Sequence, residues 1–120
     1  MNQQKVHFLI DFTIHRGKFE DFAAMVKAMI EGTANEPGAL GYEWYLSNDH
    51  SRCRLLETYA NADAVQNHLA SAVVQELVPK VLNFAAIARF EVYGSPDAES
   101  AAALKSFGAE IYPHWRGLPL

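Results

Sequence analysis

A turn that runs directly into an aromatic strand, residues 36–47, constrains the fold of this chain more than any other stretch. It begins Glu-Pro-Gly at positions 36–38. Proline disfavours helical backbone in the residue before it and glycine tolerates positive φ, so a helix arriving from upstream has to end here. Residues 40–46 are large and typical of a strand. This strand carries more aromatic surface than a simple edge strand needs, in Tyr42, Trp44 and Tyr45.

Hydrophobic periodicity predicts the elements on either side of this turn. Residues 6–14 alternate between apolar and mostly polar side chains, which indicates a half-buried strand. Apolar residues at helical spacing follow over 22–30, and this helix is expected to end near Thr33. After the aromatic strand, residues 48–51 form a turn into a third strand over 52–59, so the two strands are expected to pair as a hairpin.

The second half of the chain repeats a helix and a strand. Asn61 is expected to cap a second helix, and residues 72–82 form a further helical segment that Pro79 should kink or divide. Residues 84–93 are expected to form the fourth strand. The order strand, helix, strand, strand, helix, strand predicts an α+β fold of the ferredoxin-like, split βαβ type. In this fold a four-stranded antiparallel sheet carries both helices on one face.

The C-terminal residues add to this pattern. We expect a ferredoxin-like domain over residues 1–95 and an extension, residues 96–120, packed on the same domain. Residues 95–97 read Ser-Pro-Asp, which predicts a helix with Ser as its cap and Pro at its first position. Gly108 should end this short helix, and residues 109–115 should form a short extra strand or an extended arm.

The predicted layout leaves the second face of the sheet without a cover. Alternation along the second strand places either Tyr42 and Trp44 or Tyr45 on this face, with Leu55 or Leu56 beside them on the third strand. Such a face is not polar enough to be left in water. We therefore predict a homodimer in which two sheets pack face to face.

Charge, cysteine content and hydropathy exclude several classes of protein. The net charge is −4 and the basic residues are scattered, so neither nucleic acid nor a membrane surface is expected as a partner. The single cysteine, Cys53, cannot form an intramolecular disulfide, and no apolar stretch reaches the length of a membrane span, so a cytoplasmic location is expected. The motifs of flavin, nicotinamide, iron–sulfur and zinc sites are missing from the sequence. We expect no cofactor and no metal.

Three segments, taken in order, carry a family resemblance: residues 36–45 from the turn into the strand, Leu-Leu-Glu-Thr-Tyr at 55–59, and His-Leu-Ala-Ser at 68–71. At these separations the chain resembles the antibiotic biosynthesis monooxygenase family over about residues 5–94. The resemblance implies a dimeric α+β barrel with a pocket between the sheet and the helices of each subunit. It implies activity less directly, because the family includes cofactor-independent monooxygenases of phenols and quinols, haem-degrading enzymes and proteins of other roles.

The haem-degrading branch can be compared position by position. The resemblance places its Asn, Trp and His on Ile10, His68 and Val78 of this chain, so none of the three is kept. We therefore do not expect haem turnover by that mechanism.

His68 is the preferred candidate for a catalytic base, because an imidazole titrates near neutral pH. The alternative is a partly buried histidine that only bonds to the backbone. Glu57 lies in an otherwise apolar strand, where a carboxylate could orient His68 or receive a substrate hydroxyl. Its alternative is a structural group at a dimer seam, paired with Arg54 or Arg89.

Three aromatic residues, Trp44, Tyr45 and Tyr59, could stack on a planar substrate or could equally pack in the core or the interface. The favoured hypothesis is a cofactor-independent monooxygenase that oxidises a small aromatic phenol or quinol. The alternative is a non-catalytic protein of the same fold that binds a small ligand or serves in assembly. A third hypothesis is an isomerase or a decarboxylase.

Overall fold

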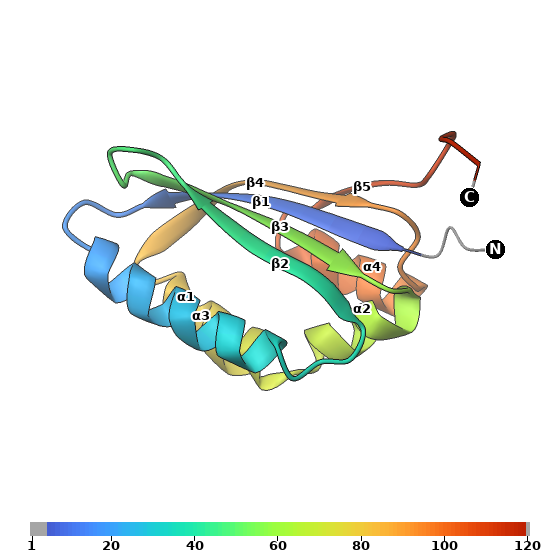
Figure 1. The fold of residues 1–120 in the computed structure, drawn as a ribbon, viewed down its shortest axis with the longest axis horizontal. Helices are drawn as coiled ribbons and strands as arrows, with labels where there is room; N and C mark the ends of the chain where they lie inside the picture. The colour runs from blue at the N-terminus through green and yellow to red at the C-terminus, as the bar shows by residue number, and fades with distance from the viewer. Residues whose placement is uncertain (1–4, 120) are drawn as a thin grey trace.

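A mixed five-stranded sheet forms one layer of the molecule and helices cover one of its faces (Figure 1). The computed structural model describes residues 5–119, and the strand order is β2-β3-β1-β4-β5. In chain order the elements are β1 (Val6–Ile14), α1 (Phe19–Thr33), β2 (Ala39–Leu46), β3 (Arg52–Tyr59), α2 (Ala62–Leu69), the π-helix η1 (Val73–Leu77), α3 (Val78–Val81), β4 (Ala85–Tyr93), α4 (Ala98–Ser106) and β5 (Glu110–Tyr112).

The predicted split βαβ order is confirmed for the first four strands, which pair antiparallel around a central β1. Of the two expectations for residues 109–115, a short extra strand or an extended arm, the strand is the one that forms: β5 joins the edge of the sheet parallel to β4. Residues 72–82 divide into η1 and α3, with Pro79 in the first turn of α3, where its missing N–H costs no helical hydrogen bond. No helix within residues 5–119 is long and apolar enough to cross a membrane.

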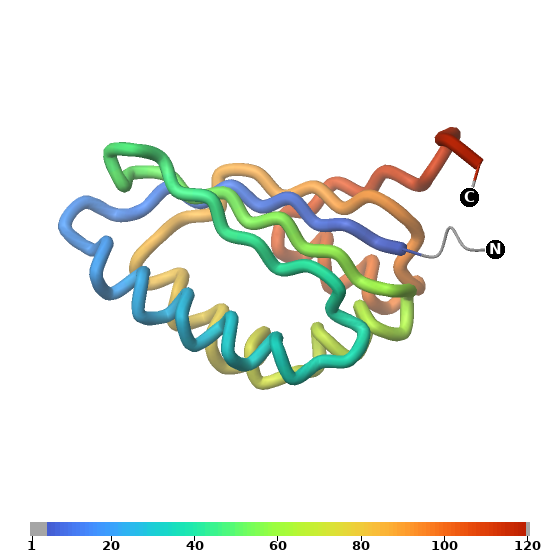
Figure 2. Tube along the Cα trace, in the orientation of Figure 1, coloured from blue at the N-terminus to red at the C-terminus, as the bar shows by residue number. Residues whose placement is uncertain are grey.

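The core lies between the sheet and the helices, which Figure 2 shows on one side of the strands only. Strand alternation brings the apolar side chains of β1 to this side, namely Val6, Phe8, Ile10, Phe12 and Ile14. The inward residues of β3 are Cys53, Leu55, Glu57 and Tyr59. A carboxylate therefore sits in a row that is otherwise apolar or aromatic.

The helix caps agree with the prediction in one case and correct it in the other. The Asn61 side chain accepts a hydrogen bond from the Ala64 N–H at 2.9 Å, as expected for the cap of α2. At α4 the predicted Ser95 cap is wrong, because Asp97 caps the helix and accepts from the Ser100 N–H at 2.7 Å. A carboxylate caps as well as a hydroxyl and also interacts favourably with the helix dipole. Gly108, at φ 90°, follows the end of α4 as predicted.

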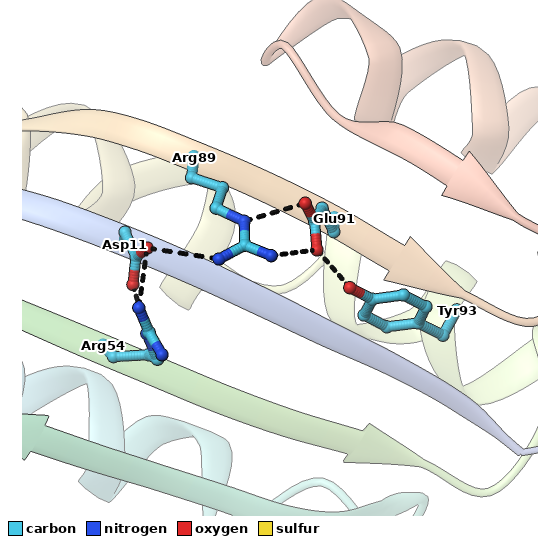
Figure 3. A network of polar contacts seen from close by, with 5 residues as sticks. All are labelled: Asp11, Arg54, Arg89, Glu91 and Tyr93. Carbon is cyan, nitrogen blue, oxygen red and sulfur yellow. Dashed lines mark hydrogen bonds and ion pairs between the residues drawn. The ribbon is translucent and has the colours of Figure 1, made fainter.

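The open face of the sheet carries a network of charged side chains (Figure 3). Arg54 Nε donates to Asp11 Oδ1 at 2.5 Å, and Arg89 Nε donates to Glu91 Oε2 at 2.8 Å. A second Arg89 nitrogen lies 4.0 Å from Asp11, and the Tyr93 hydroxyl donates to Glu91. This face is more polar than the sequence indicated, because cross-strand neighbours on β3, β1 and β4 bring opposite charges together.

Apolar surface remains beside this network. Tyr45 and Leu56 lie on the same open face and are 55% and 39% exposed. The aromatic residues of β2 thus divide by alternation, with Tyr42 and Trp44 directed to the helix side and Tyr45 to the open side.

Candidate functional site

A cavity with an almost entirely apolar wall lies between the sheet and the helices. Six of the residues that line it show which elements contribute: Phe8 and Ile10 of β1, Met29 of α1, Leu55 of β3, Phe90 of β4 and Leu104 of α4. The free space at its centre is about 50 Å³. Among the described residues, its polar lining side chains are Tyr42, Glu57 and His68, which lie on β2, β3 and α2.

Glu57 and His68 form a buried pair at this polar end. The distance from Glu57 Oε1 to His68 Nε2 is 3.5 Å, and the two residues are 3% and 4% exposed. The Tyr59 hydroxyl donates a hydrogen bond to the same Glu57 oxygen. A carboxyl group without water nearby needs such partners, because burying a polar group without a hydrogen bond is costly.

Glu36 completes the cluster from the other side of the imidazole. Its Oε1 lies 2.8 Å from His68 Nδ1, across 32 residues of sequence. Glu36 occupies the turn between α1 and β2, and Pro37 and Gly38 follow it. Sequence reasoning missed this residue as a partner of His68, because the separation in the chain gives no periodic signal.

Burial determines the protonation of the groups around the pair. Removal from water raises the pKa of Glu57, while the nearby His68 and the Tyr59 hydroxyl act in the opposite direction. Burial also raises the pKa values of Tyr42 and Tyr59 far above the ordinary tyrosine value. Both tyrosines therefore keep their hydroxyl protons at neutral pH, and Tyr59 donates its proton to Glu57.

This arrangement is suited to proton transfer in an apolar setting. An imidazole nitrogen and a carboxyl group face the same small space, and a proton can reside on either one. The apolar wall excludes water and strengthens the electrostatic interactions of any group placed beside the pair.

The structure brings together three of the five residues selected from the sequence. His68 and Glu57 line the cavity, and Tyr59 packs behind them with its ring centroid 4.9 Å from that of His68. Trp44 lies on the helix side but in the core, and Tyr45 lies on the open face, away from the cavity. The proposed stacking role of Tyr45 on a ligand in this cavity has no geometric support.

Trp44 has its own packing partners. Its ring stacks on Phe12 with centroids 5.7 Å apart and an angle of 17° between planes, and its edge meets Phe22. Glu57 does not pair with Arg54 or Arg89, since both arginines lie on the open face. Tyr42, which the sequence offered only as part of an aromatic strand, is the residue of β2 that lines the cavity.

Two of the three positions that correspond to the haem-degrading residues are part of the apolar wall, and the third is His68 at its polar end. Ile10 and Val78 both line the cavity and provide no metal-binding atom. Within residues 5–119, no group of three His, Cys, Asp or Glu side chains is arranged to hold a metal ion.

Comparison with known proteins gives one family match. The model of the family described as "Antibiotic biosynthesis monooxygenase" matches residues 6–80, from the start of β1 into α3. A search of curated protein sequences returned no significant match.

Solved structures share the fold. MupZ from Pseudomonas fluorescens superposes with a TM-score of 0.78 at 23% identity and covers 98% of this chain and 96% of its own. Protein SO0527 from Shewanella oneidensis has a TM-score of 0.64 at 27% identity and covers 76% of this chain and 88% of its own. SnoaB, a cofactor-independent oxygenase from Streptomyces nogalater, has a TM-score of 0.67 at 16% identity and covers 79% of this chain and 96% of its own. The match to MupZ thus includes α4 and β5.

Proposed function

Because the chain belongs to the antibiotic biosynthesis monooxygenase family, we propose that it is a cofactor-independent monooxygenase whose substrate is a small aromatic phenol or quinol. The observation that carries this proposal is the Glu57–His68 pair at the polar end of an apolar cavity. SnoaB, which has the same fold, is described as a cofactor-independent oxygenase and supports the same class of reaction.

The reaction needs a base and a dry cavity more than it needs bound electron carriers. His68 Nε2 accepts the phenolic proton, and the electron-rich ring carbon then forms a bond with molecular oxygen to give a hydroperoxide. The proton of this hydroperoxide is the phenolic proton, which His68 returns to the peroxide anion. The O–O bond breaks as the ring proton on the same carbon is lost, so that one oxygen atom becomes a carbonyl and the other leaves as hydroxide, which combines with the ring proton to form water. All of the electrons that reduce oxygen come from the substrate, which becomes a quinone.

The lining of the cavity favours a neutral substrate. Among residues 5–119, no Lys or Arg side chain lines it, so a phosphate or carboxylate group would be buried without a counter-charge. An apolar body with one hydroxyl group at the Glu57–His68 end matches the distribution of polar atoms. An apolar cavity that binds benzene measures roughly 150 Å³. The present 50 Å³ therefore requires a wall to move before a ring is admitted.

We also propose that the protein is a homodimer through the open face of the sheet. The exposed Tyr45 and Leu56 supply apolar contact area, and the charges of the Asp11–Arg54 and Arg89–Glu91 pairs are already matched within one subunit. Such pairs can be covered by a second copy without leaving an isolated charge, which is the main cost of burying ionised groups.

The test is oxygen uptake with a panel of phenols and quinols, recorded together with ligand-induced shifts in melting temperature. A substrate should consume oxygen, and His68→Ala should lower turnover by about 10²-fold or more, the usual range for loss of a general base. His114→Ala, which changes an exposed histidine of the tail, is the matched control. Unchanged turnover in His68→Ala removes His68 from the mechanism. Thermal stabilisation without oxygen uptake by any compound favours the ligand-binding alternative.

A further inference from the structure

We propose that Glu36 is the positioning residue of His68, and that it holds the imidazole proton on Nδ1 so that Nε2 faces Glu57 and the cavity as the proton acceptor. This inference rests on the proposed function, because it assigns a role within the same site. The site thereby becomes a relay of two carboxyl groups, Glu36 and Glu57, with one imidazole between them.

The geometry around the imidazole assigns a different role to each nitrogen. Nδ1 lies 2.8 Å from Glu36 Oε1, a distance typical of a charge-assisted hydrogen bond, whereas Nε2 lies 3.5 Å from Glu57 Oε1. Glu36 and Glu57 also differ in exposure, since their side chains are 16% and 3% exposed. The shorter contact is the one expected of a charged acceptor, so we take Glu36 as the carboxylate that accepts the Nδ1 proton.

The hydrogen positions then follow from which groups donate and which accept. An ionised carboxylate can only accept, so His68 must donate to Glu36 through Nδ1–H. Neutral His68 is left with an unprotonated Nε2. Burial raises the pKa of Glu57 and favours its protonated form, which accepts from the Tyr59 hydroxyl. At 3.5 Å from Glu57, Nε2 remains free to take a proton from a substrate. The two hydrogen bonds, from His68 to Glu36 and from Tyr59 to Glu57, then each join a donor to an acceptor. Among the described residues, the second Glu36 oxygen, Oε2, is buried without a hydrogen-bond partner.

The turn that contains Glu36 is built to sit against α2, the helix that carries His68. A side-chain carbon on Gly38 would lie 2.4 Å from the Ala64 side chain in the first turn of α2, so only glycine permits this approach. The Gly38 carbonyl also accepts from the Ala60 N–H at 2.9 Å, just before that helix begins. The Glu-Pro-Gly turn therefore fixes the carboxyl group at the imidazole.

The tautomer of His68 tests this directly and needs no substrate. We expect ¹⁵N NMR of the neutral imidazole to show a proton on Nδ1 and none on Nε2. This tautomer should outnumber the other by about tenfold or more, since a hydrogen bond to a charged acceptor is strong. In Glu36→Gln the preference should weaken several-fold, and in Glu36→Leu it should disappear. His68→Gln identifies the His68 signals, and Glu31→Gln, on the exposed side of α1, should leave them unchanged.

Two results would overturn the positioning role. One is a wild-type His68 that carries its proton on Nε2. This measurement needs no variant, so it decides the question even if the Glu36 variants fail to fold. The other is an unchanged tautomer in folded Glu36→Gln and Glu36→Leu. Neither result depends on oxygen uptake, so a failure of this inference is distinct from a failure of the proposed function.

Once the oxygen-uptake assay has identified a substrate, the kinetics of the Glu36 variant give a second test. Glu36→Gln should lower kcat by about 10²-fold, the effect of an impaired general base, with little change in KM because Glu36 does not line the cavity. A rise in KM at unchanged kcat would assign Glu36 to substrate binding and would contradict the positioning role.

Discussion

Glu57 is the residue through which this protein should respond to pH. Burial raises its pKa in the folded state above the ordinary 4.5, so the folded protein holds this proton more tightly than the unfolded chain. Its contribution to stability is complete below that ordinary pKa and is lost as the pH rises through the raised value. The groups that face it are Tyr59 on the same strand, Tyr42, His68 and Glu36.

We predict that Glu57→Gln makes the stability of the fold less dependent on pH, because an amide cannot ionise. Between about pH 5 and pH 8 the melting temperature of the wild type should fall more than that of the variant, measured by thermal unfolding in matched buffers. Replacing the exposed Glu31 of α1 with Gln gives the control, which should follow the wild type. Parallel curves for wild type and Glu57→Gln would show that ionisation of Glu57 does not affect stability.

Sequence reasoning identified the chemistry of single residues better than their partners. A carboxylate in an apolar strand and a histidine on an amphipathic helix were visible as local exceptions, which is why Glu57 and His68 could be selected. Both faces of β2 carry aromatic residues, so alternation could not decide whether Trp44 or Tyr45 faces inward. Glu36 was read only as part of a turn, because its contact with His68 depends on how α2 packs.

At the scale of elements, the contact between the Glu-Pro-Gly turn and α2 is the one most sensitive to a single carbon atom. We predict that Gly38→Ala destabilises the fold by about 1–3 kcal/mol, the usual cost of overpacking, because its new carbon would meet Ala64. Adding Ala64→Gly should recover part of this loss, although glycine itself costs about 1 kcal/mol in a helix. Urea unfolding of the two single variants and the double variant measures the coupling free energy between positions 38 and 64.

Gly41→Ala is the matched control for this cycle. An added carbon at Gly41 lies 3.5 Å from the nearest Thr58 atoms, which is ordinary van der Waals contact. Equal destabilisation by Gly38→Ala and Gly41→Ala would show that the close approach to α2 is not the cause.

The elements were predictable where a pattern extends over several residues. Alternation located β1, the turn at residues 48–51 located β3, and Pro79 predicted the division of the segment that follows α2. The cap of α4 was misplaced because Ser95 and Asp97 are both good caps two positions apart. A strand of three residues such as β5 has no period to detect, which is why residues 109–115 were left open between a short strand and an arm. Its parallel pairing with β4 depends on the path of α4.

At the scale of the whole molecule, the proposed dimer gives a direct prediction. A charge placed at Leu56, on the open face, should be buried without a partner, so Leu56→Glu should dissociate the dimer. Light scattering after gel filtration should show a dimer for the wild type and a monomer for the variant. Ala24→Glu, on the exposed side of α1, is the control and should remain dimeric. A monomeric wild type at micromolar concentration would exclude this interface.

The fold as a whole was predictable because the order of strands and helices leaves few topologies. The cavity was not predictable in the same way, since its shape depends on how the side chains of several elements fill the space between sheet and helices. The sequence indicated that a pocket should lie there but not how little room it holds.

The edge position of β5 has a consequence for how a ligand reaches that space. Only three residues pair β5 with β4, and the preceding α4 contributes Leu104 to the cavity wall and leads into Phe107, another lining residue. Short edge segments open locally at a lower free energy than the strands at the centre of a sheet. We expect the amide hydrogens of α4 and β5 to exchange with solvent well before those of β1. Transient local unfolding of this corner would then admit a ring, and the rate of that opening would limit the rate of association.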